Sequence, residues 1–132
     1  MGTKVLITGS RGIAAALVAE LSLKSYSIYL VGGEEDDCKS LAGKFEQVVG
    51  YSAIDIRDEE LVKGAFDKAI QMLGGLDHVV SIVGGSGRSF GDGAIEDVTK
   101  SAWDQTLELN LTTAFMTARE AIKYFKDHGG GS

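Results

Sequence analysis

A short glycine-containing loop follows the first apolar run of the chain. The run, residues 4–8, is rich in β-forming residues, and residues 13–24 beyond the loop carry small and apolar side chains at helical spacing. Backbone amides at a helix N-terminus bind phosphate where no side chain blocks them. The pattern therefore predicts a phosphate-binding loop between a strand and a helix, made of Gly9, Ser10, Arg11, Gly12 and Ile13. The alternative is that these small residues only let the helix pack close to the sheet.

The rest of the chain alternates apolar runs with helical patterns. Three further strands are predicted, over residues 26–31, 47–54 and 76–83. Three helices alternate with them, over residues 34–45, 59–73 and 100–126, and Asp58 and Thr99 are the N-caps of the last two. Continuous apolar strands joined by crossover helices predict an α/β fold, a three-layer Rossmann-like parallel sheet of order 3-2-1-4 with helices on both faces. Its crevice lies at the carboxyl ends of the first and fourth strands.

Composition restricts the classes of partner. The chain has 132 residues, with 13 basic against 19 acidic side chains and no basic stripe, which argues against nucleic acid. No apolar run is long enough to cross a membrane, and the N-terminal run is too short for a secretion signal, so we expect a cytoplasmic protein. Cys38 is the only cysteine, and its acidic neighbours raise the pKa of the thiol. We expect one domain over residues 1–128, a glycine-rich tail over 129–132, and a small ligand.

The motifs resemble those of the short-chain dehydrogenases and reductases. The family loop TGxxxGxG matches Thr8, Gly9, Gly12 and Ala14 when one residue is deleted between the first two glycines. Asp55, followed by Ile56, resembles the family aspartate that holds the adenine ring. The resemblance therefore implies that the chain is an NAD(P)-binding domain of an oxidoreductase.

Two further family motifs concern the segments after the fourth strand. The family sequence NNAG is replaced by SIVG, which keeps only Gly84, a cofactor-binding position in the family. The sequence WDQTLELNLTTAF, residues 103–115, places Asn110 in the position of an asparagine that holds a water in the family's proton relay. Independently of the family, Asn110 shares a predicted apolar face with Trp103 and Leu107, so we expect a buried amide that needs partners. A purely structural asparagine is the alternative.

Residues after the second strand bear on the choice of cofactor. Four carboxylates at positions 34–37 repel the 2′-phosphate of NADP and favour NAD. Arg11, in contrast, resembles the basic residue found before the second glycine in many NADP-dependent members. On balance the sequence favours NAD.

The resemblance covers the first half of the family pattern. The catalytic tyrosine of the family is followed four residues later by lysine, and none of Tyr26, Tyr29, Tyr51 and Tyr124 is. The chain alone is therefore expected to be inactive. The alternatives are a scaffold that binds no cofactor and a half-enzyme complemented by another chain. An apolar edge strand predicts a homo-oligomer that covers strand 76–83 and helix 100–126.

Overall fold

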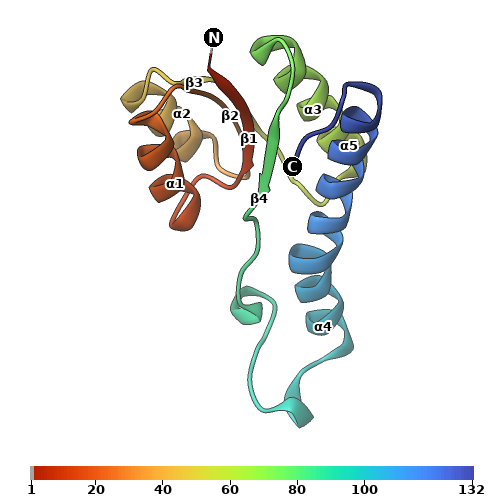
Figure 1. The fold of residues 1–132 in the computed structure, drawn as a ribbon. Helices are drawn as coiled ribbons and strands as arrows, with labels where there is room; N and C mark the ends of the chain where they lie inside the picture. The colour runs from red at the N-terminus through yellow and green to blue at the C-terminus, as the bar shows by residue number, and fades with distance from the viewer. Residues whose placement is uncertain (1) are drawn as a thin grey trace.

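A computed structural model describes residues 2–132 (Figure 1). Its four-stranded sheet has the order β3-β2-β1-β4, and every neighbouring pair is parallel. The strands are β1 (Thr3–Thr8), β2 (Tyr26–Gly32), β3 (Val48–Ala53) and β4 (His78–Ser81). The predicted α/β class and strand order are therefore confirmed.

Helices cover both faces of the sheet. They are α1 (Ile13–Ser22), α2 (Glu35–Lys44), α3 (Glu59–Leu73), α4 (Lys100–Leu107) and α5 (Thr113–Asp127). Figure 1 shows α1 and α2 on one side and α3 and α5 on the other. Alternate residues of β2 point to opposite faces of the sheet. Ile28 and Leu30 pack toward α1, whereas Tyr29 and Val31 pack toward α3. None of these helices has the length and apolar character needed to span a bilayer, in the part of the chain that the structure describes.

The predicted helix N-caps are present. The Asp58 carboxylate accepts a hydrogen bond from the Leu61 amide, and the Thr99 hydroxyl accepts one from the Ala102 amide. Each cap satisfies an amide that the first helical turn would leave without a partner. Helix α3 also ends as the sequence predicts, at the left-handed Gly74.

Strand β4 is shorter than the predicted 76–83. Beyond Ser81, the amides of Ile82 and Val83 donate to the Thr8 hydroxyl, at 2.9 and 3.3 Å, instead of to a backbone carbonyl of β1. Strand β1 can offer no further carbonyl in register, because the chain turns away at Gly9, whose φ is 109°. The β4 ladder ends there, and the cleft begins.

The predicted helix 100–126 is continuous but not uniform. A π-helical segment, η3 (Glu108–Thr112), separates α4 from α5. Its wider turn rotates the buried face, so that Ala102 is buried before it and Met116 and Ala121 are buried after it. The predicted buried face was wrong, since Trp103 is 52% exposed and Leu107 is 37% exposed.

The segment after α5 returns to the sheet. The Ser132 amide donates to the Asp77 carbonyl at 3.1 Å, and the Val79 amide donates to the Ser132 carbonyl at 2.7 Å. The expectation that β4 lacks any partner on its outer side was therefore wrong for its first residues. At the opposite end of β4, a loop with two short 3-10 turns, η1 (Gly87–Ser89) and η2 (Ile95–Asp97), extends away from the sheet beside α4 (Figure 1).

Candidate nucleotide-binding cleft

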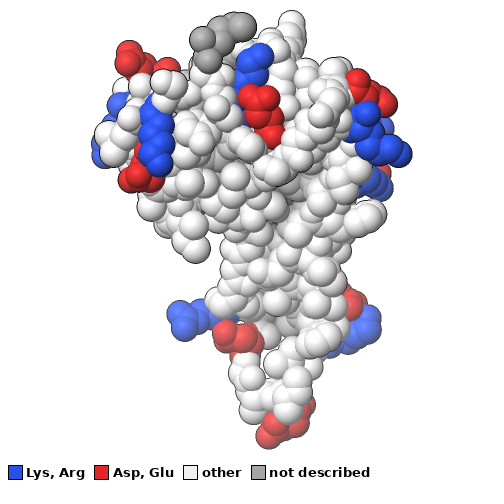
Figure 2. All heavy atoms as spheres, viewed as in Figure 1, with Lys and Arg blue, Asp and Glu red and all other residues white. Residues whose placement is uncertain are grey.

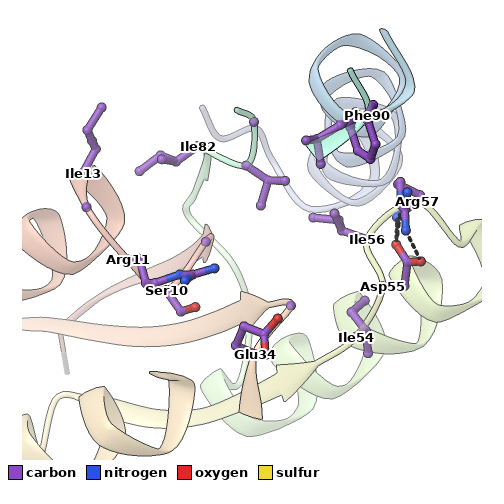
Figure 3. Close-up of a pocket in the computed structure, with 16 residues that line it drawn as sticks. Ser10, Arg11, Ile13, Glu34, Ile54, Asp55, Ile56, Arg57, Ile82 and Phe90 are labelled. Carbon is purple, nitrogen blue, oxygen red and sulfur yellow. Dashed lines mark hydrogen bonds and ion pairs between the residues drawn. The ribbon is translucent and has the colours of Figure 1, made fainter. Parts of the chain in front are cut away.

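A cleft of about 760 Å³ opens at the carboxyl ends of the strands (Figure 3). The cleft is lined by all of the residues that the sequence predicts to bind a cofactor, namely Gly9, Ser10, Arg11, Gly12, Ile13, Asp55, Ile56 and Gly84. These residues come from the segments after β1, β3 and β4. The parallel fold brings them together because each strand ends at the same edge of the sheet.

The loop after β1 depends on two left-handed glycines. Gly9 has a φ of 109° and Gly12 a φ of 53°, which side chains of L-residues rarely adopt. A Cβ atom on Gly9 would also lie 3.1 Å from the Cβ of Ala14, which is fully buried. Ala14, in place of the third family glycine, therefore packs beneath the loop without blocking the cleft.

Helix α1 begins at the cleft without a side-chain cap. Gly12 is the N-cap residue, and no side chain among residues 2–132 accepts a hydrogen bond from the first turn. Apart from its two chain neighbours, no described residue has an atom within 4 Å of a Cβ placed on Gly12, and Gly12 and Ile13 both line the cleft. Uncapped amides and the positive end of the helix dipole together favour an anion at this position.

The acidic residues after β2 have different roles. The Asp37 carboxylate pairs with the Arg11 guanidinium at 3.1 Å, and the Tyr51 hydroxyl donates to the Glu35 carboxylate at 2.6 Å. The hydrogen bond to Glu35 raises the pKa of Tyr51. Glu34 lines the cleft, and among residues 2–132 its carboxylate has no hydrogen bond or ion pair. Sequence reasoning counted Glu34 only as one of four charges, because the pattern did not show which carboxylates have partners.

Asp55 is held by a neighbour that sequence reasoning missed. The Arg57 side chain donates to both Asp55 carboxylate oxygens at 2.9 Å, and the Arg57 amide donates to Oδ1 at 3.0 Å (Figure 3). The side-chain hydrogen bond, followed by the backbone one, lowers the pKa of Asp55. Both residues line the cleft, so its wall carries a fixed, internally paired carboxylate. The sequence signal that could have indicated this pair is an aspartate followed two residues later by an arginine.

Asn110 does not line the cleft and is exposed, so the prediction of a buried amide was wrong. Its side-chain oxygen accepts from the Gly85 amide, and its nitrogen donates to the carbonyls of Gly85 and Thr106, each at 2.9 Å. These bonds fasten the loop after β4 to the π-helical segment. A Cβ on Gly84 would lie 2.6 Å from the Asn110 oxygen, which explains a glycine at this position.

Cys38 lies behind the loop after β1 and is fully buried. Burial is the main cause that raises the pKa of the thiol, ahead of the acidic neighbours that the sequence suggested, and a hydrogen bond with Ser10 partly opposes it. A Cβ on Gly32 would lie 2.6 Å from the Cys38 sulfur. Cys38 therefore acts as a packing residue under the loop.

The family model described as short chain dehydrogenase matches residues 3–132. The chain belongs to this family. Among curated relatives, the probable galactose dehydrogenase GalD of Rhizobium meliloti is 29% identical over 97% of this chain and 50% of the relative. A short chain dehydrogenase of Claviceps purpurea is 33% identical over 97% of this chain and 49% of the relative. The chain thus spans about half the length of the curated relatives it matches.

Solved structures of short-chain dehydrogenases have the same fold. A short-chain type dehydrogenase/reductase from Mycobacterium ulcerans superposes with a TM-score of 0.87 at 27% identity, covering 98% of this chain and 48% of that one. An actinorhodin polyketide ketoreductase with NADPH gives 0.89 at 18% identity, covering 98% and 51%. The match extends over this chain from end to end and shows that the cleft lies in a short-chain dehydrogenase fold.

Proposed function

We propose that this chain is the nucleotide-binding part of a short-chain dehydrogenase and binds a nicotinamide dinucleotide, NAD in preference to NADP. The uncapped N-terminus of α1, behind two left-handed glycines at the cleft, carries the proposal. The cleft volume of about 760 Å³ also lies within the range of small-molecule sites. When bound, the nicotinamide would supply hydride transfer.

Each part of the cleft fits a part of the dinucleotide. The amides of Gly12 and Ile13 would hold the pyrophosphate, since both residues line the cleft at the uncapped start of α1. Asp55 and Ile56 would hold the adenine, with Arg57 fixing the Asp55 carboxylate. Gly84 would allow the close approach of the nicotinamide half.

The charges near Glu34 support the preference for NAD. The free Glu34 carboxylate can accept hydrogen bonds from a ribose diol, whereas it repels a 2′-phosphate. Arg11, the residue that would attract that phosphate, is already paired with Asp37. NADP would have to compete with Asp37 for Arg11.

We further propose that the chain alone transfers no hydride at a useful rate. None of its four tyrosines is followed four residues later by lysine. A positioned general acid or base contributes roughly 10²- to 10⁴-fold to the rate, and this chain offers no such pair. Asn110, in the proton-relay position of the family, is engaged with the backbone of Gly85 and Thr106.

Titration of the chain with NADH and NADPH, followed by nucleotide fluorescence, tests the proposal. We expect NADH to saturate below about 1 mM and NADPH to bind at least about tenfold more weakly. Glu34→Gln should narrow this difference, and Asp37→Asn, which frees Arg11, should improve NADPH binding. Glu46→Gln is the matched control, because Glu46 is exposed and lies outside the cleft. If neither NADH nor NADPH saturates the chain at about 2 mM, the proposal is wrong, and the alternative of a scaffold that binds no cofactor remains.

An exposed apolar stripe supports a homo-oligomer. It runs along α4, η3 and the start of α5 and consists of Trp103, Leu107, Leu111 and Phe115, which are between 37 and 64% exposed. Contiguous exposed apolar side chains of this size are typical of protein interfaces. We propose that the helical part of the predicted contact, residues 100–126, pairs with a second copy. Sedimentation of a single monomeric species at micromolar concentration would overturn this.

A further inference from the structure

Among residues 2–132, Phe90 is the one aromatic side chain that lines the cleft. It is partly buried, yet it belongs to neither of the two apolar cores that pack against the sheet. Figure 2 shows that the narrow part of the molecule below the sheet, which carries this loop, is largely free of charged side chains on the face in view. Phe90 therefore presents an aromatic ring to the cleft without serving the core of the fold.

The loop that carries Phe90 is packed closely against α4. A Cβ on Gly87 would lie 2.7 Å from the Thr106 hydroxyl oxygen, so the close approach of loop and helix requires glycine here. Gly91, with a φ of 107°, approaches Ala102, whose Cβ would be 3.9 Å from an added Cβ. The Phe90 amide donates to the Gly87 carbonyl at 2.9 Å. Contacts on both sides of Phe90 thus hold it in the cleft wall.

Phe90 lies at the end of the cleft that the residues after β3 form. Figure 3 shows Phe90 above Ile56 and Arg57, with Ile13 at the far end of the cleft. Leu109, from η3, lines the same cleft. This end of the cleft is therefore lined by apolar side chains and by the flat guanidinium of Arg57.

The Asp55 carboxylate has room for one more hydrogen-bond donor at this end. Arg57 donates twice to Oδ1 and once to Oδ2. A carboxylate has about four acceptor sites, so one site on Oδ2 stays free among the described residues. Apolar and aromatic side chains suit the faces of a planar base, and the free site suits a single N–H group at its edge. Adenine, with one exocyclic amino group, has this combination.

We propose that Phe90 stacks on the adenine ring of the bound nucleotide and covers the face of the base opposite Ile56, while Asp55 accepts a hydrogen bond from the amino group. This inference rests on the proposed function, because it places one part of the same nucleotide. Phe90 is then a specificity-determining residue for the base and makes no contact with the nicotinamide.

Titration of Phe90→Ala with two nucleotides tests this placement. ADP and NADH share the adenosine diphosphate, and only NADH carries the nicotinamide. We expect Phe90→Ala to weaken both by the same factor, roughly 5- to 150-fold, which is the effect of losing one base–aromatic stack. Phe90→Tyr keeps the aromatic face and should stay within about twofold of the parent. Calorimetry measures ADP, and nucleotide fluorescence measures NADH.

Proton NMR of bound ADP reports on the stack directly. The adenine H2 and H8 resonances should move upfield on binding to the parent and to Phe90→Tyr, because the ring current of an aromatic side chain shields protons above its face. They should not move upfield at saturation of Phe90→Ala. A purely structural role of Phe90 would change affinity without producing these shifts.

Ile95→Ala is the matched control. Ile95 belongs to the same loop, is 78% exposed and lies outside the cleft. Its truncation should leave the affinities for ADP and NADH unchanged. Phe90→Ala should fold like the parent, since Phe90 lies outside both cores.

Four results would overturn the inference. Loss of affinity for NADH alone would place Phe90 at the nicotinamide. Unchanged affinities for both nucleotides in Phe90→Ala, or adenine protons that do not move upfield in the parent, would remove the stack while leaving nucleotide binding intact. If the parent binds neither ADP nor NADH, the proposed function fails and the placement of adenine fails with it.

Discussion

The two flanks of the sheet differ in how deeply their residues are buried. On one flank, β2 lies between β1 and β3, and its residues Ile28, Tyr29 and Leu30 are at most 1% exposed. On the other flank, no residue of β4 is fully buried, and among the described residues the outer edge of the strand forms backbone hydrogen bonds with Ser132 alone. The β2 flank supplies most of the apolar core, whereas every residue of β4 is at least partly exposed.

The nucleotide cleft lies where these two flanks meet. The loop after β1 belongs to the fully packed flank, because Ala14 and Cys38 fill the space directly beneath it. The opposite wall belongs to the open flank, where Asn110 fastens the segment after Gly84. We infer that the side of the cleft next to β1 is preformed, while the side next to β4 depends on a few hydrogen bonds between a loop and a helix.

The largest expected effect is a contrast between two leucines. Leu30→Ala should lower the free energy of unfolding by about 2–5 kcal/mol, because Leu30 is fully buried on β2 and leaves a cavity. Leu111→Ala, the same truncation at a side chain that is 64% exposed, should change the stability of the monomer by less than about 0.5 kcal/mol. Urea unfolding at low protein concentration measures both. Equal losses would contradict the difference between the flanks.

The sequence predicted the packed flank well because its signals are local. The alternation of strands and helices, the Asp58 cap and the Gly9 turn each depend on neighbouring residues, and the structure contains all three. The open flank was predicted less well. A π-helical segment within residues 100–126 changed which side chains are buried, and no spacing in the sequence indicates that extra residue per turn.

In the candidate site too, features that depend on neighbouring residues were predicted better than features that depend on distant contacts. Every predicted lining residue reaches the cleft, because each follows directly on the end of a strand or forms the first turn of a helix. Asn110 does not, since its contacts depend on how a long helix packs against a distant loop. The roles of Glu34 and Arg57 follow from which charges find partners, which is a property of the folded chain.

Valine substitutions at two threonines of α5 are expected to change the free energy of unfolding by smaller amounts, and in opposite directions. Thr117→Val should raise the free energy of unfolding by about 1–2 kcal/mol, because it removes a buried hydroxyl without a partner. Thr113→Val should lower it by about 1 kcal/mol, because the Thr113 hydroxyl donates to the Leu109 carbonyl. Thermal and urea unfolding of both variants measure the pair. A loss of stability in both would mean that Thr117 has a partner in solution.

The smallest expected effect concerns the charge pair in the cleft wall. Arg57 lowers the pKa of Asp55 below its unfolded value of 3.8, so the ionised carboxylate stabilises the folded chain above that pH. This contribution is lost as the pH falls through the lower, folded-state pKa. Because the Asp55 side chain is 52% exposed, solvent screening keeps its size below about 1 kcal/mol.

Arg57→Gln tests this linkage. The variant keeps the backbone hydrogen bond to Asp55 but loses both side-chain ones, so its stability should fall less steeply than that of the parent between about pH 4 and pH 2. Urea unfolding at several pH values in this window measures the slopes. Arg88→Gln is the control, because its pair with Asp92 at 3.9 Å is long and exposed. If the free energy of unfolding of the parent and of Arg57→Gln changes with pH by the same slope, solvent already screens the pair of Arg57 and Asp55. The shape of the cleft wall would then depend on the backbone of β3 and α3 alone.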